Sequence, residues 1–116
     1  MQFDSKRAAL SSEEIRRLIA WREKTRRALP GGFEAVVELW ENNAAGITPS
    51  LARRRANFLE GLLKNLGVPA ADIEPAAIRQ SAREVNSDYD ERFLNTGAIL
   101  LNPRCPHICC DAGDIR

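Results

Sequence analysis

The apolar residues between positions 51 and 66 recur at intervals of three and four. They are Leu51, Phe58, Leu59, Leu62, Leu63 and Leu66. This spacing places one apolar stripe along an α-helix. Pro49 suits the first turn of that helix, and Ser50 is a candidate cap. Gly67 favours a C-terminal cap with a positive φ angle. We therefore predict a helix over residues 49–66.

A second helix and a strand are predicted in the first third of the chain. Ser11 and Ser12, followed by two glutamates, are typical of a helix start with acidic residues in its first turn. Pro30 interrupts the helical pattern, so we predict a helix over residues 11–29. Residues 33–40 are rich in β-favouring side chains, with apolar residues at odd and even positions. This pattern predicts a strand that is covered on both faces.

The remaining elements are shorter. The apolar pattern predicts strands over residues 72–79 and 97–101, the second of them buried. It also predicts a short helix over residues 85–95. Residues 1–4 are too few to be assigned as a strand from their own pattern. Counted as a strand, they give the order β-α-β-α-β-(α)-β, which predicts an α+β fold with helices packed on one sheet.

Length and charge limit the classes of protein to consider. With 116 residues, 44% hydrophobic and 28% charged, the chain suits one globular domain. Its 17 basic and 16 acidic residues leave a net charge of +1, which gives no overall field for recruiting nucleic acid or an acidic membrane. No apolar run approaches the roughly 20 residues that cross a bilayer, and the N-terminus lacks the order of a signal peptide. The sequence does not decide whether the parent protein is secreted or lipid-anchored.

The three cysteines lie together near the C-terminus, at positions 105, 109 and 110. Two of them could pair, one could pair with another chain, or all could stay reduced. We expect the folded domain to span residues 1–103 and the tail, residues 104–116, to be mobile or to lie loosely on the surface.

The sequence predicts neither a metal site nor an enzyme. Cys105, Cys109 and Cys110, with His107 and Asp111, supply ligand types for zinc or copper, but a second paired half at zinc-finger spacing is missing. His107 has no placed partner for nucleophilic catalysis. Phosphate-binding loops and the common hydrolase motifs are also missing. We therefore expect no cofactor.

Three stretches of the chain resemble the OmpA-like domain, the peptidoglycan-binding module of outer-membrane proteins and peptidoglycan-associated lipoproteins. Phe3-Asp4 is similar to the end of that family's first strand. Residues 51–56, Leu-Ala-Arg-Arg-Arg-Ala, are similar to its Leu-Ser-x-x-Arg-Ala motif, and residues 66–73 are similar to the turn after its second helix. The resemblance covers residues 1–103 and implies a mixed sheet.

The resemblance also implies a binding site. In that family, an Asp after the second strand and the motif Arg hold the zwitterionic end of diaminopimelate. An arginine fork suits a carboxylate, and an acid suits the ammonium group. Arg55 matches the motif Arg. Counting back from Leu51 without a gap places Trp40 at the position of the family's Asp, whereas a shift of one residue places Glu41 there. Thr48 replaces the usual Asn, and Asn43 replaces the usual Gly.

The leading hypothesis is a non-catalytic cell-envelope domain of a bacterium, periplasmic or associated with the outer membrane, that holds diaminopimelate-containing peptidoglycan stems. Arg55, Glu41, Thr48 and Asn43 are its predicted ligand-binding residues. The altered motif positions leave an alternative, in which a degenerate OmpA-like scaffold has lost the ligand and binds envelope proteins instead. Neither hypothesis involves nucleic acid. We expect Arg53 and Arg54 to form a solvated helix face.

Overall fold

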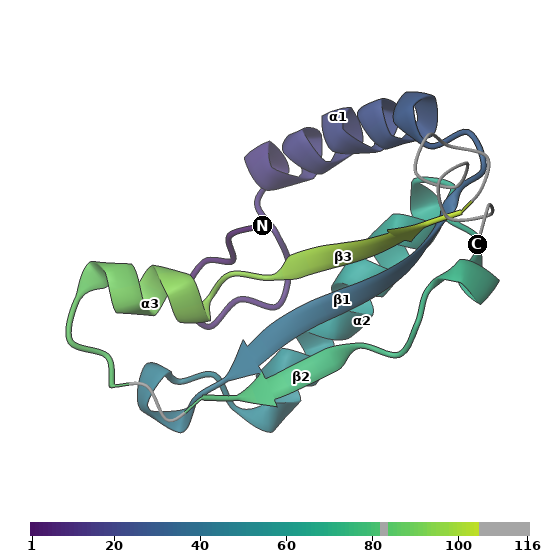
Figure 1. The fold of residues 1–116 in the computed structure, drawn as a ribbon. Helices are drawn as coiled ribbons and strands as arrows, with labels where there is room; N and C mark the ends of the chain where they lie inside the picture. The colour runs from purple at the N-terminus through teal and green to yellow at the C-terminus, as the bar shows by residue number, and fades with distance from the viewer. Residues whose placement is uncertain (82–83, 105–116) are drawn as a thin grey trace, which may run out of the picture.

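The sheet is built around β1 (Phe33–Glu41), which lies between β2 (Ala77–Gln80) and β3 (Ala98–Pro103) in the computed structural model (Figure 1). β2 pairs with β1 in parallel, and β3 pairs with it antiparallel. The structure describes residues 1–81 and 84–104. The sheet is mixed and is accompanied by helices, which confirms the predicted α+β class.

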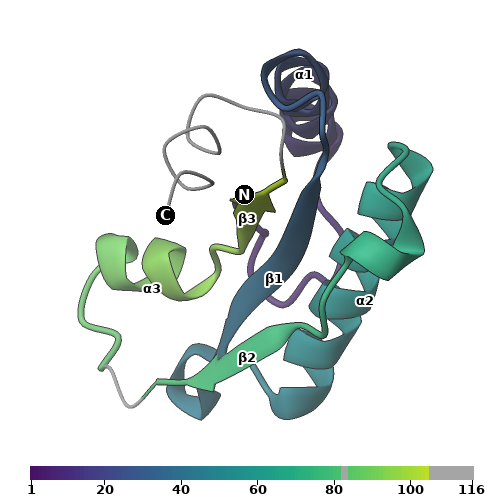
Figure 2. The same ribbon diagram turned by 45° about the vertical axis from the view of Figure 1, so that its right-hand side comes forward.

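β1 carries the core of the domain on alternate residues. Phe33, Ala35, Val37 and Leu39 are at most 3% exposed. They pack against α2 (Pro49–Asn65), which lies along one face of the sheet (Figure 2). On the opposite face, the ring of Trp40 packs on Phe93 with centroids 5.5 Å apart. Phe93 belongs to α3 (Asp88–Leu94), which lies on that side of the sheet near the end of β1.

α2 follows the predicted helix closely and ends one residue earlier, at Asn65. Its cap differs from the prediction: the side chain of Thr48, not Ser50, accepts a 3.1 Å hydrogen bond from the backbone N–H of Leu51. The reason is that Pro49 occupies the first helical position, which makes the residue before it the cap. Gly67 has the expected positive φ angle, 91°.

α1 (Ser12–Ala28) confirms the predicted first helix and lies beside β3 (Figure 1). Ser11 caps it by accepting a 3.3 Å hydrogen bond from the N–H of Glu14. The helix is tied to the rest of the domain by Arg22, whose Nε donates to the carbonyl of Leu66 at 3.1 Å.

The first residues form an extended segment with one isolated bridge, between Gln2 and Thr96, in place of a full strand. Phe3 donates its N–H to the carbonyl of Asn95 at 2.9 Å, and Gly97 donates to the carbonyl of Met1 at 2.8 Å. The pairing stops there because the chain turns at Asp4.

Two later elements are shorter than predicted. The strand expected over residues 72–79 is preceded by a 3-10 turn, η2 (Ala70–Asp72), and reaches full pairing only in β2, from Ala77. α3 is seven residues long and lies within the predicted range of 85–95. β3 begins one residue later than predicted and extends to Pro103. The prediction that this strand is buried was wrong, because β3 lies at the edge of the sheet and its residues are half-buried or exposed.

Arg104, the first residue of the predicted tail, is tied to the domain. Its guanidinium contacts Asp72 at 2.7 Å and Glu34 at 3.2 Å. Hydrogen bonds to Asp72 and then to Glu34 raise the pKa of Arg104. The predictions on the cysteines, on His107 and on the rest of the tail concern positions outside the described residues.

Candidate functional site

A tight turn at the N-terminus, Asp4–Arg7, starts the candidate site. The N–H of Arg7 donates to the carbonyl of Asp4 at 3.0 Å and closes this N-terminal turn. Lys6, at its third position, has a φ angle of 61° and is the one non-glycine residue with positive φ in the described part of the chain. Type II turns require a positive φ there, which glycine adopts more readily than lysine. The backbone of Lys6 is therefore held by its surroundings.

Arg55 supplies that support from beneath. Its side chain is only 1% exposed. Nε donates to the carbonyl of Arg7 at 2.8 Å, and Nη2 donates to the carbonyl of Asp4 at 3.2 Å. One guanidinium thus holds both ends of the N-terminal turn.

Two further contacts fix the guanidinium of Arg55. Nη2 also donates to Oδ1 of Asn95 at 2.8 Å, and the guanidinium carbon lies 4.7 Å from the ring centroid of Phe3. Asn95 in turn donates from Nδ2 to the carbonyl of Glu91 at 2.9 Å, which links Arg55 to α3. A cation over an aromatic face is an attractive arrangement that strengthens as water is removed.

Burial lowers the pKa of Arg55 to about 10, because desolvation penalises the charged form. The guanidinium therefore stays protonated at neutral pH. Its bonded acceptors are two carbonyls and one amide oxygen, so the positive charge is stabilised by dipoles.

A cavity of about 430 Å³ opens beside the N-terminal turn, and we call it the Lys6 cavity. Its second wall is the turn of residues 43–46, which contains η1 (Asn43–Ala45) and follows β1. Its third wall comes from α3 and the segment before it. The lining residues are Ser5, Lys6, Asn43, Ala44, Ala45, Gly46, Val85 and Glu91.

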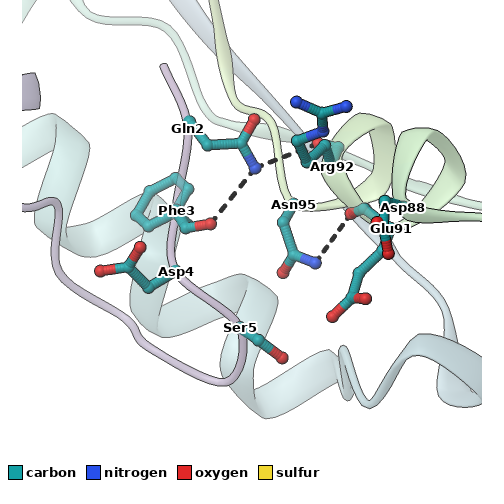
Figure 3. A pocket seen from close by; sticks show the side chains of 8 residues that line it. All are labelled: Gln2, Phe3, Asp4, Ser5, Asp88, Glu91, Arg92 and Asn95. Carbon is teal, nitrogen blue, oxygen red and sulfur yellow. Dashed lines mark hydrogen bonds between the residues drawn. The ribbon is translucent and has the colours of Figure 1, made fainter.

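A second cavity, of about 490 Å³, adjoins the Lys6 cavity and shares Ser5 and Glu91 with it (Figure 3). We call it the Phe3 cavity. Figure 3 shows the Glu91 side chain pointing from α3 towards the turn that carries Ser5, whereas the Asp4 carboxylate points away from α3. The remaining lining residues are Gln2, Phe3, Asp4, Asp88, Arg92 and Asn95.

The four predicted ligand residues lie in different surroundings. Asn43 is exposed and lines the Lys6 cavity. Glu41 lines a separate cavity of about 260 Å³, to which Asn43 also contributes. Thr48 uses its hydroxyl to cap α2, and Arg55 lies beneath the N-terminal turn. The structure brings Asn43 and Glu41 together and gives Thr48 and Arg55 bonds within the protein.

Trp40, the other candidate for the acid position, packs on Phe93 and belongs to the core near α3. Sequence reasoning missed Lys6 and Glu91. Nothing in the local pattern around Lys6 marks a left-handed residue. Glu91 falls within a predicted helix that offered many acidic side chains, and only the fold shows which of them reaches the cavity.

Within residues 1–81 and 84–104, no group of three His, Cys, Asp or Glu side chains is arranged to hold a metal ion. None of the helices in that part of the chain is long and apolar enough to cross a membrane.

Comparison with known proteins identifies the fold. Neither a protein-family profile nor a curated protein sequence matches this chain. Solved structures do. The OmpA-like domain of FopA1 from Francisella tularensis subsp. tularensis SCHU S4 is 14% identical with a TM-score of 0.65, over 88% of this chain and 70% of that one. The C-terminal domain of Helicobacter pylori MotB is 17% identical with a TM-score of 0.67, over 98% of this chain and 88% of that one.

The periplasmic domain of the same MotB is also similar, at 14% identity and a TM-score of 0.66 over 99% of this chain and 78% of that one. The chain therefore has the fold of an OmpA-like domain, in a sequence that diverges strongly from these structures. This finding confirms the resemblance drawn from the sequence.

Proposed function

We propose that this domain binds the peptide stem of peptidoglycan non-covalently, in the periplasm or envelope of a bacterium, and catalyses no reaction. The observation that carries the proposal is the Lys6 cavity. One of its walls is the turn after β1, which the family resemblance associates with the ligand, and Asn43 lies in that wall. The OmpA-like fold supports the same assignment.

The four predicted residues receive distinct roles in this proposal. The amide of Asn43 contacts the stem within the Lys6 cavity. Glu41 attracts the ammonium group of the stem from the separate cavity of about 260 Å³, which Asn43 also lines. Thr48 fixes the start of α2. Arg55 supports the N-terminal turn from beneath through its hydrogen bonds to the carbonyls of Arg7 and Asp4.

A calorimetric titration with a diaminopimelate-containing stem tripeptide tests this proposal. Binding should weaken as salt is added, because the main contacts are ionic. The matched control is the tripeptide with lysine in place of diaminopimelate. Lysine lacks the carboxylate at the end of the diaminopimelate side chain, so this peptide should bind more weakly. Asn43→Ala should reduce affinity without changing stability. Absence of affinity in the folded domain would overturn the proposal.

A second candidate function is binding of another envelope protein on a scaffold that no longer holds the stem. Two observations favour it: the Arg55 fork is already bonded inside the protein, and Trp40 packs on Phe93 where the resemblance expects an acid. The same titration separates the candidates. A folded domain without affinity for the tripeptide supports this second function, and measurable affinity removes it.

A further inference from the structure

The Lys6 cavity carries one positive and one negative side chain from separate elements. Lys6 lies in the N-terminal turn and Glu91 lies in α3. No ion pair joins them, and neither pairs with another charged side chain in the described part of the chain. Two opposite charges that line one cavity without pairing leave room for a group that carries both charges.

The backbone around Lys6 is held firmly enough to present a charge. Arg55 fixes the carbonyls of Asp4 and Arg7 on either side of it. The Lys6 stem passes over Gly46, where an added Cβ would lie 3.5 Å from Cε. A left-handed backbone costs a non-glycine residue about 1 kcal/mol and persists only where the surroundings determine it. This cost is consistent with a residue retained for its side chain.

Glu91 is held on the other side of the cavity. The amide of Asn95 donates to its carbonyl, so the same residue that receives a hydrogen bond from Arg55 also fixes this part of α3. The carboxylate points towards the N-terminal turn (Figure 3). Of the other charged residues nearby, Asp4, Asp88 and Arg92 line the adjoining Phe3 cavity.

We propose that Lys6 and Glu91 recognise the zwitterionic amino-acid centre at the end of the bound stem. The ammonium of Lys6 binds the carboxylate of that centre from the solvent side, and the carboxylate of Glu91 binds its ammonium group. The cavity volume of about 430 Å³ falls within the range of ligand sites, roughly 300–1,000 Å³. This inference rests on the proposed function. It adds Lys6 as a cation of the site and gives Glu91 the direct contact with the ammonium group, which Glu41 attracts from its own cavity.

Chemically modified tripeptides test the two contacts separately. One probe has the carboxylate of the zwitterionic centre amidated, and another has its amine acetylated. Lys6→Gln should weaken binding of the parent tripeptide about tenfold, the scale of one charge-assisted contact, and should leave binding of the amidated probe nearly unchanged. Glu91→Gln should show the same selectivity towards the acetylated probe. Lys64→Gln and Glu74→Gln, at exposed positions outside these cavities, are the matched controls.

Lys6→Gly is a second variant, because it removes the ammonium and relieves the backbone at once. It should lose binding as Lys6→Gln does, with urea unfolding confirming that both variants are folded. The inference is overturned if the wild type binds the parent tripeptide while Lys6→Gln and Glu91→Gln bind it equally well. It is also overturned if Glu41→Gln, and not Glu91→Gln, loses sensitivity to acetylation. A wild type that binds no tripeptide instead overturns the proposed function itself.

Discussion

Nη2 of Arg55 donates a 2.8 Å hydrogen bond to Oδ1 of Asn95, across 40 positions of sequence. This bond joins the middle of α2 to the residue that caps the end of α3. Together with the bonds to Asp4 and Arg7, it makes one buried cation the common support of three segments. The same three segments line the Lys6 and Phe3 cavities or lie directly beneath them.

Replacing Arg55 by Met should destabilise the domain by about 2–4 kcal/mol, because two carbonyls and one amide oxygen lose a charged donor within the protein. Urea unfolding followed by circular dichroism measures the change. Arg54→Met, at an exposed position of the same helix, is the control and should change stability by less than about 0.5 kcal/mol. Equal stability of the two variants would show that the Arg55 network contributes nothing.

The pKa of Arg55 gives this stability effect a defined pH dependence. Below about pH 9 the guanidinium is protonated in both the folded and the unfolded state, so it contributes no slope. Above about pH 10 the folded state loses its proton before the unfolded state does. The unfolded state then binds more protons, and the contribution of Arg55 to the unfolding free energy rises with pH.

The stability difference between the wild type and Arg55→Met should accordingly stay constant from about pH 6 to pH 8. Urea midpoints at three pH values in that range check it. A difference that grows or shrinks steadily across the range would mean that another titrating group interacts with Arg55.

Lys6→Gly should stabilise the domain by about 0.5–1 kcal/mol, because glycine adopts the positive φ angle of 61° without the steric cost that lysine bears. The control is Lys24→Gly, in the interior of α1, which should destabilise the domain by a similar amount. Opposite signs of the two changes in thermal unfolding are the expected result. A loss of stability in both variants would contradict the strain assigned to Lys6.

Gly97→Ala should destabilise the domain by about 1–3 kcal/mol, because it overpacks the core. An added Cβ would lie 2.9 Å from Cδ2 of Leu39 and 3.3 Å from both Leu59 and Phe3. Gly61→Ala is the matched control, since a Cβ there meets nothing within 4 Å and the position is helical. That variant should gain about 0.5–1 kcal/mol. Measured unfolding free energies of the two variants decide the matter.

The sequence pattern predicted the elements well where side-chain periodicity and local caps agree. The stripe of leucines defined α2, and the alternation from Phe33 to Leu39 defined β1. Pairing between segments that lie far apart in the sequence was harder to predict from the local pattern. Residues 1–4 form only one bridge, because their partner near Thr96 and the turn at Asp4 are set by tertiary contacts.

The candidate site was less predictable than the fold. Arg55 was expected to face a ligand, yet it lies four residues after Leu51 and four before Leu59 on the buried side of α2. This spacing places Arg55 on the same face of α2 as the buried leucines and therefore indicates that Arg55 is buried. The resemblance alone provided no such signal for Lys6 and Glu91, because their meeting depends on how the N-terminal turn and α3 approach each other. The proposed roles of Glu41, Thr48 and Asn43 stay predictions.

The bonds from Arg55 to the N-terminal turn make residues 1–7 and the segment of residues 95–97 part of one folding unit. A segment of seven residues at a terminus would ordinarily fray in local openings. Here the turn cannot leave without stranding a buried cation, so such openings approach the cost of global unfolding. The backbone amides of Phe3 and Gly97, which pair these two segments, should therefore exchange with deuterium as slowly as those of β1.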